Sequence, residues 1–118
     1  MGYGICFRDH IGHFMHGESS WKQCYMPTIE AEATTLLASI QSTLAHDYQA
    51  VLFETDCKSV VDALASHSAP QNELGDIISQ CKILLSNNNN YPVSFVRRQR
   101  LLIVWLEHPY LILAPCLQ

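Results

Sequence analysis

An apolar segment that ends in acidic residues, directly before a helical pattern, constrains this chain most. Residues 50–55 are mostly apolar, as a buried strand would be, and Asp56 follows at once. A second acidic segment opens the preceding helical pattern, where Glu30 and Glu32 flank an apolar stripe. Ligands in α/β folds bind at the carboxyl ends of the strands. The pattern therefore predicts a sheet edge that brings two carboxylates together.

Hydrophobic periodicity predicts the remaining elements. Residues 3–8 and 13–20 are expected to form a hairpin, residues 50–55 and 93–98 further strands, and residues 58–65 and 73–86 helices, with a long helix capped by Thr28 before them. A hairpin followed by alternating helices and strands is typical of a mixed sheet with helices packed on it. The predicted fold class is therefore α/β.

Length and charge limit the function. A chain of 118 residues with 48% hydrophobic content fits one globular domain with a core of its own. The net charge is −4, whereas proteins that grip nucleic acid non-specifically are usually basic. This negative net charge argues against non-specific electrostatic binding of nucleic acid. It does not exclude a site that binds a polyanion through metal ions.

Cysteine usage and hydropathy indicate where such a chain resides. The five cysteines form no CxxC pair, are odd in number and lie mostly among apolar residues, so we expect reduced, buried thiols. Residues 1–15 have no signal-peptide pattern, and the longest apolar run, residues 101–106, is far too short to span a bilayer. We expect an intracellular protein, in the nucleus or cytoplasm, with no membrane contact.

Local patterns leave the roles of the acidic residues open. Asp56 lies where a helix N-cap is expected, and capping would explain an acid at this position without any bound ligand. Glu30 and Glu32 could each be solvated edge residues or first-turn acids favoured by the helix dipole. Glu54 shares a strand face with Asp56 and is a weaker third candidate, because side chains alternate along a strand.

Four motifs in order resemble a known family. They are RDHIG at residues 8–12, EAEA at 30–33, ETDCKSVV at 54–61 and VSFVRRQ at 93–99. Together they resemble the ribonuclease H-like superfamily, in the plant-type RNase H branch associated with reverse transcriptases and retroelements. The resemblance covers residues 1–99.

This resemblance implies an activity and a set of site residues. The family hydrolyses RNA endonucleolytically in RNA–DNA hybrids, and four acidic positions hold two Mg²⁺ ions. By motif match, Glu32 is the helix acid and Asp56 the strand acid, so both are expected to be catalytic metal ligands. Arg97 and Arg98 could contact nucleic-acid phosphates or simply form a solvated strand end.

The chain also departs from the family pattern at both ends. The family's first strand, with its acid, would precede residue 1, so the sheet is expected to lack its central strand and to leave pairing partners open. Residues 100–118 do not match the family's last helix and its acid. We therefore expect an RNase H-like domain at residues 1–99 and a divergent tail at 100–118.

A shift of reading frame would explain the tail. With suitable synonymous codons, residues 100–108 can be read in another frame as Ala-Ser-Asp-Arg-Val-Ala-Arg-Ala, which resembles the expected helix. With two of four acids absent, we expect weak or no cleavage. The alternatives are an inactive module that binds nucleic acid or protein, and a decayed retroelement fragment.

Histidines in the hairpin raise the question of zinc. His10, His13 and His16 lie close in sequence, but a structural zinc site needs four ligands. His13 and His16 are expected on opposite faces, and no cysteine lies at ligand spacing. The sequence therefore does not favour zinc binding by these three residues.

Overall fold

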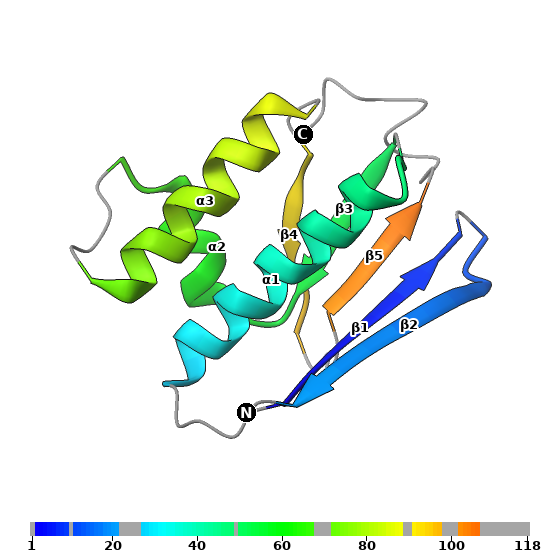
Figure 1. Ribbon diagram of the computed structural model, residues 1–118, viewed down its shortest axis with the longest axis horizontal. Coiled ribbons are helices and arrows are strands. Elements are labelled where there is room, and N and C mark those ends of the chain that lie inside the picture. Colours follow the sequence, from blue (N-terminus) through cyan, green and yellow to red (C-terminus); the bar gives the residue numbers. More distant parts are fainter. Residues whose placement is uncertain are drawn as a thin grey trace.

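The computed structural model describes residues 2–9, 11–21, 27–48, 50–67, 72–88, 91–97 and 102–106. Within these ranges the chain forms a five-stranded mixed sheet and three helices (Figure 1). In chain order the elements are β1 (Gly2–Arg8), β2 (Phe14–Trp21), α1 (Thr28–Ala45), β3 (Val51–Thr55), α2 (Lys58–Ala65), α3 (Glu73–Asn87), β4 (Val93–Phe95) and β5 (Leu102–Leu106). The predicted mixed α/β class is confirmed, and the arrangement is consistent with an RNase H-like fold.

Strand β5 lies in the middle of the sheet, whose order is β2-β1-β5-β3-β4. It pairs in parallel with β1, with Phe7 opposite Val104, and antiparallel with β3, with Phe53 opposite Val104. The prediction that the hairpin and the strand at 50–55 would lack partners is therefore wrong. Residues 102–106, an apolar run within the predicted tail, form the central strand of the sheet. The division of the chain at residue 99 stays a prediction.

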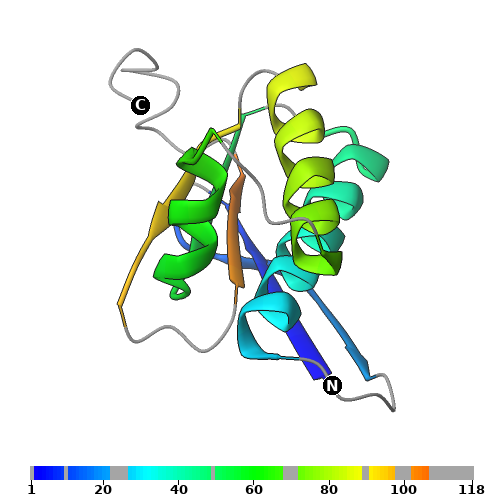
Figure 2. The same ribbon diagram turned by 90° about the vertical axis from the view of Figure 1, so that its left-hand side faces the viewer.

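The sheet has one face that is buried beneath the helices. Along β5, buried and half-buried residues alternate, as expected for a strand with one covered face. Phe7, Phe53 and Val104, from three adjacent strands, are fully buried in one hydrophobic cluster. Helices α1 and α3 lie side by side, and α1 packs on β1 and β5 (Figures 1 and 2). The apolar stripes predicted for both helices add Ala33, Leu36, Ile40, Ile78, Cys81 and Leu85 to this core.

The predicted start of α1 and the predicted end of β4 differ from the structure. Pro27, not Thr28, occupies the N-cap position of α1, and no side chain caps this end by a hydrogen bond. Strand β4 ends at Phe95 instead of residue 98, because the chain turns at Arg97. At α3, by contrast, the Asn72 side chain accepts a hydrogen bond of 3.0 Å from the Gly75 N–H and supplies a regular cap.

The described cysteines agree with the predicted thiol state. Cys6 and Cys81 are free and buried, and Cys57 is free and half-buried, while Cys24 and Cys116 lie outside the described residues. Of the helices that the structure describes, none combines the length and the hydrophobicity needed to cross a membrane.

Candidate active site

Glu32 and Asp56 interact at one edge of the sheet, namely the edge formed by the carboxyl ends of β3 and β4. Asp56 directly follows β3 and is exposed, and Glu32 is half-buried near the start of α1. Burial raises the pKa of Glu32, and the negative charge of Asp56 raises it further. Two carboxylates that repel each other in this way bind a cation favourably, because the cation relieves their repulsion.

The structure also separates Glu32 from its neighbour Glu30. Partial desolvation, a hydrogen bond with the Glu73 side chain and the charge of Glu73 raise the pKa of Glu30. Glu30 therefore faces the start of α3, whereas Glu32 faces the end of β3. The two acids that the helical periodicity could not rank thus have different surroundings, and only Glu32 interacts with Asp56.

The N-cap alternative for Asp56 is wrong. Helix α2 begins at Lys58 with Cys57 at the N-cap position, and no side chain makes a cap hydrogen bond there. The Cys57 N–H donates instead to Thr55 Oγ1, at 3.2 Å. Helix capping therefore does not account for an acid at position 56.

Glu54 has a different structural role from Asp56. Its Oε1 accepts a hydrogen bond of 2.6 Å from the indole Nε1 of Trp105 on β5. This contact lies within the sheet, between β3 and β5, and it holds the carboxylate against a neighbouring strand. We therefore do not include Glu54 in the candidate site.

Arg97 lies at the same sheet edge as Asp56. Strands β3 and β4 are parallel, with Thr55 opposite Phe95, and the Val96 N–H donates to the Thr55 carbonyl at 2.9 Å. The residues that follow the two strands therefore share one edge, and Arg97 is exposed there. Arg98, the second predicted phosphate contact, lies outside the described residues.

The donor set at this edge is small and consists of oxygen atoms. Carboxylate oxygens suit Mg²⁺, which also keeps waters and takes phosphate oxygens as ligands. Residues 102–106 of β5 read LIVWL and add no acid to the pair. The chemistry of Glu32 and Asp56 therefore fits one Mg²⁺ shared with a phosphate, and it falls short of an all-protein site.

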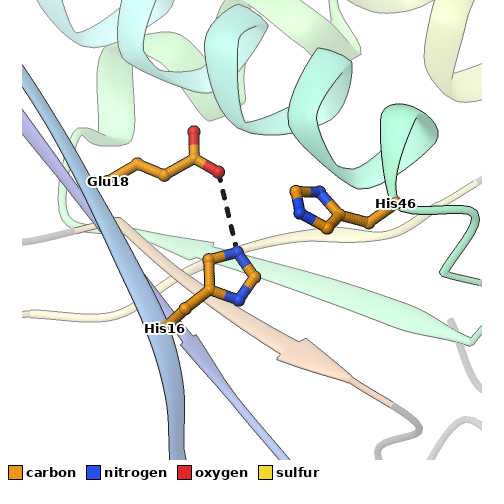
Figure 3. A group of neighbouring side chains, drawn as sticks. All are labelled: His16, Glu18 and His46. Atoms are coloured by element: carbon orange, nitrogen blue, oxygen red, sulfur yellow. Dashed lines mark ion pairs between the residues drawn. The ribbon is translucent and has the colours of Figure 1, made fainter.

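A second cluster of potential ligands was not predicted from the sequence. His16, Glu18 and His46 converge between β2 and the end of α1 (Figure 3). The i, i+2 spacing of His16 and Glu18, which places both on one strand face, is the only sequence signal for it. His13 does not belong to this cluster, and His10 lies outside the described residues.

The mixed sheet and its three helices are consistent with an RNase H-like domain, and Asp56 follows the carboxyl end of β3. Comparison with protein families agrees, since the family described as reverse transcriptase-like matches residues 2–103. The chain belongs to this family and is a reverse transcriptase-like RNase H domain. Searches of curated proteins and of solved structures found no match.

Proposed function

We propose that this domain binds RNA–DNA hybrids at the edge formed by Glu32, Asp56 and Arg97, with Mg²⁺ as a bridge, and that its cleavage of the RNA strand is weak or absent. The observation that carries the proposal is the electrostatic coupling of Glu32 to Asp56 at the end of a buried strand. Family membership supports nucleic acid as the partner.

The residues of this edge would have distinct roles. Glu32 and Asp56 would hold Mg²⁺, which supplies Lewis-acid stabilisation and an acidified water at the scissile phosphodiester. Arg97, exposed beyond β4, would contact a neighbouring phosphate, and Arg98 extends this basic segment in the sequence. The half-burial of Glu32 would keep its carboxylate in a fixed orientation.

From the 118 residues on their own we expect weak cleavage, because of their ligand count. The resemblance implies four acidic positions, and the 118 residues match two of them. Mg²⁺ demands nearly ideal octahedral geometry, so an incomplete site would hold it loosely. Binding of the hybrid without cleavage would make the domain a recognition module. Aggregation of the purified protein would instead favour a decayed retroelement fragment.

Binding can be tested by fluorescence anisotropy with a labelled RNA–DNA hybrid, in Mg²⁺ and in EDTA. We expect Mg²⁺-dependent binding that Asp56→Asn and Glu32→Gln each weaken. Asp76→Asn is the matched control, because it removes one negative charge from an exposed site on α3. Equal binding in EDTA, or equal binding by all variants, would contradict the proposed metal bridge.

Cleavage is tested on the same hybrid with the RNA strand labelled. We expect a rate at or near background for the wild-type chain. Robust Mg²⁺-dependent cleavage that Asp56→Asn abolishes would show that the two acids suffice, and would overturn the expectation of weak activity.

A further inference from the structure

Three potential metal ligands from separate parts of the chain meet on the side of β2 that faces α1. One ligand atom each from His16, Glu18 and His46 lies within 4.8 Å of the others. Figure 3 shows the two histidine rings and the carboxylate turned toward a common space between the strand and the helix end. It is the one three-ligand group found among the described residues.

Strand register places two of the ligands on one face. In the β1–β2 ladder, His16 is opposite Phe7 and Glu18 is opposite Ile5. Phe7 and Ile5 are both buried in the core beneath the helices, so His16 and Glu18 point to the helical side as well. The His16 ring stacks on Phe7, with ring centroids 4.2 Å apart, which fixes its position.

The third ligand comes from the end of α1 and has a fixed ring orientation. His46 is the C-cap residue, and its Nδ1 lies 2.8 Å from the Ser42 carbonyl oxygen. A carbonyl oxygen only accepts, so Nδ1 carries the proton and donates. In a neutral imidazole this leaves the Nε2 lone pair available to a metal ion, which is the usual arrangement of metal-bound histidines.

Ser42 also orients the carboxylate. Its hydroxyl donates a short hydrogen bond to Glu18 Oε2. One residue of α1 thus fixes both Glu18, through its side chain, and His46, through its carbonyl. Ligands that are held by such outer contacts need little reorganisation to bind a metal.

The distance between His16 and Glu18 suits two ligands of a single ion. His16 Nε2 is buried without a hydrogen-bond partner in the described structure, and it lies 3.6 Å from Glu18 Oε2. Two ligands at about 2.1 Å from a tetrahedral ion are separated by about 3.4 Å. A metal ion between the two side chains would therefore give His16 Nε2 a ligand bond with little movement of either side chain.

From these contacts we propose that His16, Glu18 and His46 form a Zn²⁺ site with an open fourth position. Two imidazoles and one carboxylate are a ligand set that Zn²⁺ accepts, while imidazole does not suit Mg²⁺. Because His46 is exposed, water can take the fourth position. The bound ion would tie the edge strand β2 to the end of α1.

This site is independent of the Glu32–Asp56 edge. His46 follows Glu32 by fourteen positions, which corresponds to about 21 Å along the helix axis. Failure of hybrid binding would therefore leave the zinc proposal untouched, and the reverse also holds.

The test is a titration of the purified, metal-free chain with Zn²⁺ against a chromophoric chelator. We expect one ion per chain, with affinity reduced at least about tenfold by His46→Ala and by Glu18→Gln. His13→Ala is the matched control, because His13 lies on the same hairpin, is exposed and is not part of the cluster. Since His46 is exposed, its variant is expected to fold even if His16→Ala does not.

Free thiols are the competing Zn²⁺ ligands, and Co²⁺ separates them from the proposed site. A His–Glu site gives visible d–d bands without a thiolate charge-transfer band, and His46→Ala should abolish those bands. Unchanged Zn²⁺ affinity in His46→Ala, a thiolate band with Co²⁺, or no binding at all would overturn the proposal.

Discussion

The indole Nε1 of Trp105 donates a 2.6 Å hydrogen bond to Glu54 Oε1, and this contact joins β5 to β3. The two residues lie 51 positions apart, on a strand that the sequence motifs predict and on one that they do not. The contact shows that residues of the supposed tail make specific interactions with the RNase H-like motifs. Strand β5 is therefore held in the same sheet as β3 by a side-chain contact as well as by its backbone ladder.

Loss of the Trp105–Glu54 hydrogen bond should destabilise the fold. Trp105→Phe keeps an aromatic ring and removes the donor, so we expect a loss of about 1–2 kcal/mol in the free energy of unfolding. Glu54→Leu removes the acceptor and should cost a similar amount. Urea unfolding of both single variants and the double variant measures the coupling. Additive losses would mean that the hydrogen bond contributes nothing.

The central position of β5 gives a second prediction. Val104 is fully buried between Phe7 and Phe53, so Val104→Ala should lower the free energy of unfolding by about 2 kcal/mol. Ile103 is half-buried on the other face of the same strand, and Ile103→Ala is the matched control, with an expected loss of about 1 kcal/mol or less. Equal, small losses in thermal or urea unfolding would show that β5 is not part of the core.

Sequence patterns predicted the elements that have local signals. The stripe of α3 recurs at helical spacing over its whole length, and β3 is an apolar run that leads into one of the four motifs. The bounds of each differ from the structure by one residue. Strand β5 was missed for a physical reason. A short apolar run has no periodicity that separates strand from helix, and its partners, such as Phe7 and Phe53, are distant in sequence. Its length of five residues was the available signal.

The candidate site shows the same division between local and tertiary information. The motif resemblance singled out Glu32 and Asp56, and the structure gives them a shared electrostatic environment. Helical periodicity alone could not rank Glu32 above Glu30, because only tertiary packing decides which acid faces β3. His46 meets His16 through the packing of α1 on the hairpin, for which the sequence carries no local signal.

Cys81 should be unreactive in the folded protein. Its thiol is fully buried, and burial raises its pKa from 9.0 to about 12, so at pH 8 its thiolate fraction falls about a thousandfold. We expect iodoacetamide to label half-buried Cys57 much faster than Cys81 in native protein, as measured by peptide mass spectrometry. Urea should remove the difference. Equal labelling rates in the native state would contradict the packing of α3 against α1.

Neutralising Glu32 should stabilise the domain at neutral pH. Burial and the charge of Asp56 raise the pKa of Glu32 above its ordinary value of 4.5. The folded state therefore retains this proton over a pH range in which the unfolded state has lost it. The free energy of unfolding falls as the pH rises from about 4.5 through the raised pKa, and this part of the stability stays lost above it.

Glu32→Gln removes this titration, so its melting temperature should exceed that of the wild type at pH 7 and approach it at pH 4. Asp62→Asn, an exposed acid on α2, is the control and should change the unfolding free energy by less than about 0.5 kcal/mol. Millimolar Mg²⁺ at pH 7 should raise the melting temperature of the wild type and leave Glu32→Gln unchanged, because the ion relieves the repulsion that the variant lacks. A Glu32→Gln protein that is less stable than the wild type at pH 7 would show that burial and the charge of Asp56 do not destabilise the ionised form of Glu32.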